Sequence, residues 1–559
     1  MSPQPPAHGP EAATAGPSND SPAARYAELA PVVKLAAGVA GAAIVLLALW
    51  ARFHGLLGQT PFHDEWHALI AVATESPWQS AAKFGAADRS IPVVLWLHLL
   101  EATIGLTAVT LWLPFAVAGL LGVAGLPWLL RRELGIAGSL SLAALLAASP
   151  LLVFYSRFLR PYGICALGAV IAVVVLADFA ERPTRARGLL LVLLASAVCW
   201  ALPVFVPFLA GAMLFELARH MRAPRRHLPA LVAVAAATAC ALVLLFAPAL
   251  LADAHSLGQK GLAGHPTAAG LIMGIRLLLG GGAAAWSALL VTLAGLGAAQ
   301  LELAAPRRFR CLGAACAAQI ATVLVVRPAE LERSFVFARY ELPVGIVILA
   351  AAAAGVAWLA RRSTLLAVVA AALIAGFVAP SAMDLATAGR DNFASMRLYQ
   401  RFFFSRAELE AWFPALPPAY RSAFAGDPGG LGGVIEVPYN GLLRVPYPYY
   451  QQLHGREVFL GQAERLCIEE GNRELPTDGK SGIRLQRFID LADRDALRKS
   501  GARFVVFHQD VESEVPWVRQ ETRRRNRFDF SRCVAAFGKS TGRVPMVADG
   551  LAVFDLAEL

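Results

Sequence analysis

Long apolar stretches separated by short polar segments run through the first two thirds of the chain. About eleven of them approach the roughly 20 residues that a helix needs to cross the hydrocarbon core of a bilayer. The pattern predicts a polytopic α-helical membrane protein with about eleven transmembrane helices. The apolar stretches lie at about 32–51, 108–130, 137–154, 162–178, 188–202, 204–218, 229–251, 281–304, 311–326, 343–360 and 364–380.

The polar segments between these stretches alternate between two kinds. One kind is basic: Arg131-Arg132, Arg182 with Arg185 and Arg187, Arg219 through His227, Arg307 with Arg308 and Arg310, and Arg361-Arg362. The other kind is mixed or acidic: 52–107, 155–161, 252–268 and 327–342. Because basic loops mark the cytoplasmic side of a membrane protein, the N-terminus is predicted to lie inside and the C-terminus outside.

One apolar segment breaks this regularity. Residues 91–107 (IPVVLWLHLLEATIGLT) are apolar but short, and they contain His98 and Glu101. If this segment crossed the membrane, it would add one span before all the basic loops. Those loops could then lie in the cytoplasm only if the N-terminus lay outside. We therefore predict a helix that lies at the outer membrane interface.

The pattern also predicts how the chain divides. Residues 1–30 are rich in Pro, Ala and Ser without an apolar run, as in a disordered cytoplasmic tail. Residues 31–380 would form the transmembrane domain, with 52–107 as its first external loop. Residues 381–559 have ordinary turn signals, two β-rich runs (GVIEVPY and ARFVVFH) and a helical run with a glycine stop (DLADRDALRKSG). They are predicted to form an extracytoplasmic α/β domain.

Composition agrees with a membrane protein. The 559 residues are 57% hydrophobic and only 16% charged, whereas soluble domains carry about 25% charged residues. The net charge of +10 is explained by the cytoplasmic loops, so nucleic acid is not an expected partner. Of the seven cysteines, only Cys467 and Cys533 lie in the predicted outer domain. In an oxidising compartment such a pair is expected to form a disulfide.

The first external loop contains the string PFHDEWHAL at 61–69. On a helix, His63 and His67 would share a face beside Asp64, which resembles the H-E-x-x-H zinc signature with a shorter acid. A zinc site would need a third ligand, and no second cluster of ligands appears later in the chain. The string could also serve only to hydrate the end of a helix. Together with Glu65 and Asp88, Asp64 brings three carboxylates to the outer membrane surface.

Arginines also occur on this surface, where the loop-charge rule disfavours them. Residues 155–161 read YSRFLRP, with Arg157 and Arg160 three residues apart and Tyr162 following, and Arg339 lies in FARYELP. Such arginines can extend to lipid headgroups. Their rigid donor fork also suits them to hold a phosphate group.

These strings together resemble the GT-C membrane glycosyltransferases, and in particular the bacterial branch of the protein mannosyltransferase and aminoarabinose transferase group. The resemblance rests on the acidic pair after the first span, YSRFLRPYGI after the third and FARYELPVGI opening a late span. In the outer domain it rests on IEVPY, HGREVFLG and FVVFH. It extends over most of residues 34–559.

The resemblance implies a transferase in the bacterial cytoplasmic membrane that takes sugar from a polyprenyl-phosphate donor. Asp64 would be the catalytic base, and Arg157, Arg160 and Arg339 would bind the phosphate. Tyr162, Glu65 and Asp88 would contact substrate. The acceptor would be an envelope lipid, glycan or protein. No cofactor is expected, although a divalent metal at Asp64 and His67 stays open. The rival interpretation is a lipid-linked saccharide transporter or a non-catalytic scaffold, neither of which needs Asp64 as a base.

Overall fold

The computed structural model describes most of the helical region and the core of the C-terminal domain. The described residues are 22–54, 56, 65–84, 90–222, 227–258, 262, 264–280, 284–328, 331, 334–363, 369, 372–374, 376, 417–425, 432–437, 456, 462–464, 466–467, 488–509, 529–557 and 559.

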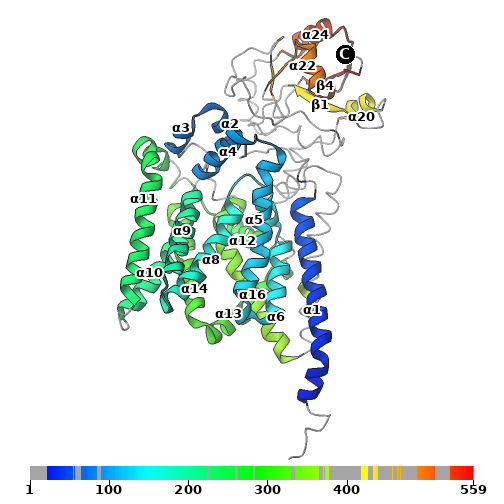
Figure 1. The fold of residues 1–559 in the computed structure, drawn as a ribbon. Coiled ribbons are helices and arrows are strands. Elements are labelled where there is room, and N and C mark those ends of the chain that lie inside the picture. The colour runs from blue at the N-terminus through cyan, green and yellow to red at the C-terminus, as the bar shows by residue number, and fades with distance from the viewer. Residues whose placement is uncertain are drawn as a thin grey trace, which may run out of the picture.

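The helical part begins with a long helix and continues through long helices interrupted by shorter ones (Figure 1). The long helices are α1 (Pro22–Phe53), α5 (Ala108–Leu129), α6 (Arg131–Ala148), α8 (Tyr162–Glu181), α9 (Arg185–Ala201), α10 (Val206–Arg222), α11 (Leu228–Gly258), α13 (Ala284–Ala304), α14 (Pro306–Val326) and α16 (Leu342–Arg362). The shorter ones are α2 (Glu65–Thr74), α3 (Pro77–Ala81), α4 (Ile91–Thr103), α7 (Pro150–Ser156), η2 (Pro203–Phe205), α12 (Ala268–Leu278) and α15 (Ser334–Tyr340).

The protein is a multi-pass membrane protein. Among the described residues, eight helices are long and apolar enough to cross a membrane, or nine when the bent pair α6 and α7 counts as one span. They match nine of the eleven predicted spans. Of the other two, α9 is a helix of 17 residues, and 364–380 lies mostly outside the described residues.

Three details differ from the sequence-based prediction. Helix α1 begins at Pro22, inside the segment predicted to be a disordered tail. The third predicted span is broken before Pro150, where α6 and α7 meet at 61°, because proline lacks the N–H that would continue the helix. Helix α12 was not predicted, since its 11 residues follow a polar loop and are too few to give a membrane-length signal.

The helix predicted at the membrane interface is present as α4. Its 13 residues span about 20 Å at 1.5 Å per residue, which is too short to cross a hydrocarbon core of about 30 Å. Helices α2, α3 and α4 gather at one end of the helical domain (Figure 1). We call this the loop end, and we call the opposite end, where Arg131, Arg219 and Arg307 lie, the basic end.

The C-terminal domain contains a four-stranded sheet in the order β1-β4-β6-β5. Strand β1 (Gly433–Val437) is parallel to β4 (Ala502–His508), and β6 (Leu551–Asp555) is antiparallel to both β4 and β5 (Met546–Ala548). A parallel pair, β2 (Gln462–Glu464) with β3 (Phe488–Asp490), forms a separate two-stranded sheet. Both strands predicted from β-rich runs, β1 and β4, are therefore present, which agrees with the predicted α/β class.

Strand β4 is buried on both faces. Phe504 and Val506 contact the cluster beneath α20 (Pro418–Phe424), whereas Val505 and Phe507 contact the cluster beneath α24 (Phe530–Thr541). This alternation follows from the two-residue period of a strand. The predicted glycine-stopped helix is α22 (Arg494–Lys499), which begins at the Asp493 cap and is followed by Gly501 at φ 72°.

A buried polar cluster connects α20 to the sheet. The Tyr420 hydroxyl donates to both Glu436 oxygens, at 3.0 and 2.8 Å, and His508 Nε2 lies 2.7 Å from Glu436 Oε2. Glu436 and His508 come from the IEVPY and FVVFH strings. Their side chains satisfy one another in the domain interior, so the cluster fixes the position of α20.

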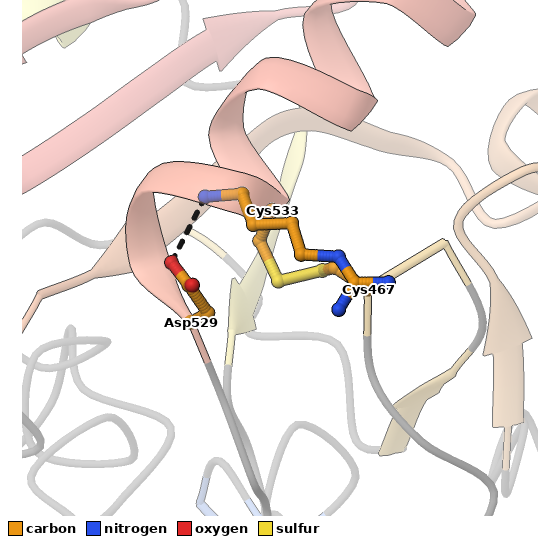
Figure 2. The surroundings of a disulfide bond; sticks show 4 residues. Cys467, Asp529 and Cys533 are labelled. Atoms are coloured by element: carbon orange, nitrogen blue, oxygen red, sulfur yellow. Dashed lines mark hydrogen bonds between the residues drawn. A yellow bond between two sulfur atoms is a disulfide. The ribbon is translucent and has the colours of Figure 1, made fainter.

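A disulfide joins Cys467 to Cys533, with the two Cα atoms 5.0 Å apart. Figure 2 shows the bond beside the first turn of α24, where the Asp529 carboxylate caps the helix by accepting a hydrogen bond from the Arg532 amide at 3.0 Å. The bond connects α24 to the segment after β2. This is the pairing that the sequence predicts.

Replacing Cys467 and Cys533 together with serine should lower the free energy of unfolding of the C-terminal domain by about 2–4 kcal/mol, because the bond restricts the unfolded chain. Denaturant unfolding of the full-length protein in detergent would measure this. Replacing the exposed Cys240 is the control and should change nothing. Peptide mapping of unreduced protein that finds both domain thiols free would contradict the prediction.

Candidate functional site

Glu65, the second residue of the acidic pair in the first loop, is held in the protein interior. This residue begins α2 and is fully buried. Its Oε1 accepts hydrogen bonds from Trp112 Nε1 at 2.8 Å and from the Leu159 amide at 2.7 Å. Glu65 therefore connects three parts of the chain: the first loop, α5 and the turn that carries the SRFLRP string.

These contacts bear on the role expected for Glu65. The sequence suggested a side chain that binds sugar or acceptor hydroxyls, but its Oε1 is engaged by two protein donors in a buried position. A buried carboxylate that accepts charge-assisted hydrogen bonds fixes the groups around it. These two bonds connect the start of α2 to α5 and to the 157–162 turn, and the substrate-binding role of Glu65 stays a prediction.

Arg157 follows α7 and is also buried. Its Nη1 donates to the carbonyl oxygens of Ala51, at 3.1 Å, and His54, at 2.7 Å, at the end of α1. Burial lowers the pKa of Arg157 to about 10, so the guanidinium stays charged at neutral pH. A cation at the C-terminal end of a helix is favourable, so Arg157 holds α1 in place in addition to any contact with a phosphate.

Helix α1 in turn supplies an arginine, Arg52, that binds the end of α6. Arg52 Nη1 and Nη2 donate to the carbonyl oxygens of Ala147 and Leu146, both at 3.1 Å, at the end of α6. Arginines thus bind the carbonyl ends of α1 and α6. The two contacts fix the first span against the break between α6 and α7, next to the SRFLRP turn.

Tyr162 and Arg339 come together across the site. Tyr162 begins α8, and the Arg339 guanidinium lies 5.6 Å from the centre of its ring. Arg339 belongs to α15 and is only partly buried, whereas Arg157 and Arg160 are almost fully buried. Among these three arginines, Arg339 is therefore the most accessible to an anionic ligand.

Aromatic side chains form the wall behind this pair. Tyr155 lies 5.0 Å from Tyr162 and 5.9 Å from Phe335, measured between ring centres. The rings come from α7, α8 and α15. Such edge and tilted contacts make a rigid support for the charged groups in front of them.

Several of the predicted site residues lie outside the described residues, namely Asp64, Asp88 and His63. Within the described part of the chain, no group of three His, Cys, Asp or Glu side chains could hold a metal ion. Of the described candidates, Arg157, Arg160 and Tyr162 belong to the turn at 157–162, and Glu65 and Arg339 contact it. Trp112 was not recognised from the sequence, because an indole near the end of a span is an ordinary feature of membrane helices.

Glu341 was also missed, although it stands in the FARYELP string. It directly precedes α16 and is almost fully buried, and neither carboxylate oxygen has a hydrogen-bond partner among the described residues. Burial raises the pKa of Glu341 to about 8 from a usual value of 4.5. The side chain is therefore mainly neutral at pH 7.

This raised pKa predicts how stability depends on pH. Between about pH 4.5 and 8 the folded protein keeps the Glu341 proton while the unfolded chain loses it. The free energy of unfolding should therefore fall as pH rises through this window, by about 1.4 kcal/mol per unit. Glu341→Gln should remove this dependence. Thermal unfolding of the wild type and of Glu341→Gln in detergent at pH 6 and 8 would measure this pH dependence. An equal change in stability between the two pH values in both proteins would contradict the raised pKa of Glu341.

Comparison with known proteins finds solved structures with a similar fold. No protein-family model matches the chain, and neither does any curated protein. Among solved structures, ArnT of Cupriavidus metallidurans bound to undecaprenyl phosphate is similar over 92% of this chain and 98% of its own, at 13% identity and a TM-score of 0.44. The apo oligosaccharyltransferase of Archaeoglobus fulgidus is similar over 86% of this chain and 70% of its own, at 15% identity and a TM-score of 0.42. At such identities and TM-scores, neither likeness indicates a shared activity.

Proposed function

We propose that this protein is a membrane glycosyltransferase that moves a sugar from a polyprenyl-phosphate donor to an envelope acceptor at the outer face of the cytoplasmic membrane. The acceptor class includes lipid, glycan and protein hydroxyl or amine groups. The C-terminal domain would then lie outside the cytoplasm, on the side of the loop end.

The convergence of three separate strings at one place supports this proposal most strongly. Glu65 in the first loop binds the amide of Leu159, which is 94 residues away in the SRFLRP turn. Tyr162, at the end of that turn, is in contact with Arg339 from FARYELP. Three of the strings that resemble GT-C glycosyltransferases therefore meet around a single turn. Glu65, which contacts this turn, directly follows Asp64 in the sequence.

The proposed reaction needs a base and a cation. Asp64 would accept the proton of the acceptor hydroxyl or amine while its oxygen or nitrogen attacks C1 of the sugar. The bond from C1 to the phosphate oxygen breaks, and the polyprenyl phosphate leaves as an anion. Arg339, supported by Tyr162, would stabilise that anion, with Arg160 close in the same turn. A single displacement of this kind inverts the anomeric centre.

The rival function, transport or scaffolding of lipid-linked saccharides, would retain the cationic groups without forming a new glycosidic bond. The described geometry bears on this choice through Glu65. Two hydrogen bonds hold Glu65, the residue directly after Asp64 in the sequence, at the start of α2; a base needs a fixed neighbourhood of this kind. A carrier has no need for a carboxylate in a fixed position.

Right-side-out membrane vesicles offer the direct test. A polyprenyl-phosphate sugar carrying a radiolabel is supplied in the outer leaflet, and labelled acceptor is collected with time. Transfer should require the protein and should continue when nucleotide sugars are absent. Movement of label across the membrane without a new product would favour the carrier, and transfer only in inverted vesicles would overturn the placement of the site.

A further inference from the structure

A cavity opens at the basic end of the helical domain, far along the helices from the loop end. Its empty volume is about 520 Å³, including the space at its open mouth. The only charged side chains in its lining are Glu133, from α6, and Arg308, from α14. The walls are otherwise apolar, and their main residues are Leu134, Val170, Leu312, Val347, Ala350 and Ala351.

The cavity reaches to hydrocarbon depth. Val170 lies 11 residues before the end of α8 at Glu181, and Ala350 lies 12 residues before the end of α16 at Arg362. At 1.5 Å per residue these positions are about 16–18 Å from the basic end, or about half the thickness of the hydrocarbon core. Apolar cavities of this kind exclude water, so hydrocarbon is the natural content.

One wall of the cavity cannot easily move. A Cβ atom on Gly297 of α13 would overlap the Ala351 carbonyl oxygen of α16, and one on Gly355 would overlap the Leu293 carbonyl oxygen. The two helices are therefore in backbone contact, as small residues allow in membrane helices. Because their separation is already at its minimum, the cavity cannot be closed by bringing α13 and α16 together.

The mouth of the cavity is polar, and two carboxylates share its arginine. Arg308 pairs with Glu133 and with Asp178, whose Oδ1 lies 2.6 Å from the Arg308 Nη2. The other oxygen of Glu133, Oε2, is buried without a hydrogen-bond partner among the described residues. A buried carboxylate oxygen without a donor is costly, so a ligand that supplies an N–H group would be favoured here.

We propose that this cavity binds an amine-headed zwitterionic phospholipid, of the phosphatidylethanolamine kind, from the cytoplasmic leaflet. One acyl chain fills the apolar cavity, and the ammonium group donates to Glu133 Oε2. The phosphate then lies beside Arg132, which directly precedes Glu133 and is exposed. A choline headgroup lacks the N–H donors, and a purely anionic headgroup offers Glu133 Oε2 no ammonium donor. The proposal is independent of the sugar-transfer reaction.

The test uses the full-length protein in mixed micelles containing equal amounts of ethanolamine, choline and glycerol phospholipids. Native mass spectrometry should detect one tightly retained ethanolamine lipid per protein. Glu133→Gln should weaken its retention at least about tenfold, because a charge-assisted hydrogen bond is lost. Asp178→Asn is the matched control: it removes the same charge from the Arg308 pair but does not line the cavity, so retention should be unchanged.

The apolar part is tested by Ala350→Phe, which fills the cavity and should remove the retained lipid. If that variant is not monodisperse, Ala350→Val serves the same purpose with a smaller loss. Equal retention of the three headgroups, or equal loss in the Asp178 and Glu133 variants, would overturn the ammonium assignment. Retention unchanged by filling the cavity, or a retained polyprenyl lipid instead, would overturn the proposed occupant.

Discussion

Replacing Asp64 with asparagine is expected to reduce sugar transfer by about 10²–10⁴-fold while the protein stays folded. Asparagine has nearly the same shape as aspartate but cannot accept the acceptor's proton, and loss of a general base has effects of this size. The measurement is the initial rate of labelled product formation in right-side-out vesicles, at matched protein levels.

The matched control replaces His63 and His67 together with glutamine. If the histidines only shape the loop, most of the activity should survive in this variant. Should the Asp64 variant transfer sugar at the wild-type rate, Asp64 is not the base. Loss of activity in the histidine variant together with loss of bound zinc would instead support the metal interpretation.

The second large effect is expected at Glu65. Glu65→Ala leaves the Trp112 Nε1–H and the Leu159 amide, which donate at 2.8 and 2.7 Å, without their shared acceptor in a buried place. This should destabilise the protein by about 3–5 kcal/mol. Glu65→Gln keeps an acceptor oxygen and should lose much less. Thermal unfolding of the detergent-solubilised protein measures both variants.

A positioning role and a substrate-binding role differ in what the glutamine variant does. If Glu65 positions the loop, Glu65→Gln should keep both stability and most of the activity, and Trp112→Phe should cost stability in proportion to one lost hydrogen bond. If Glu65 binds a substrate hydroxyl, the glutamine variant should instead raise the KM for that substrate at unchanged stability. The second result would restore the role first expected from the sequence.

Much of the helical fold could be predicted from the sequence, because membrane helices must satisfy their own backbone hydrogen bonds and must be apolar for a fixed length. The end of α5 at Leu129 and the non-spanning α4 follow from this rule. The rule does not cover short helices that lie within the protein. Helix α12 was therefore missed, and so was the break before Pro150, where the apolar run itself continues.

The candidate site was predictable in composition but not in detail. The short strings identified Glu65, Arg157 and Arg339 as residues that belong together, and the described contacts place them around one turn. Their roles depend on partners far away in the sequence, such as Trp112 for Glu65 and the carbonyl groups after Ala51 for Arg157. No local pattern specifies such partners, so burial and function could not be separated from the sequence alone.

The two arginine contacts at the carbonyl ends of α1 and α6 have a consequence for protein engineering. Here Arg52 must reach α6, and the carbonyl groups of Ala51 and His54 must be presented to Arg157. The first helix is therefore held by arginine contacts on both sides of the break between α6 and α7, and chimeras should join the chain before Pro22 rather than after it.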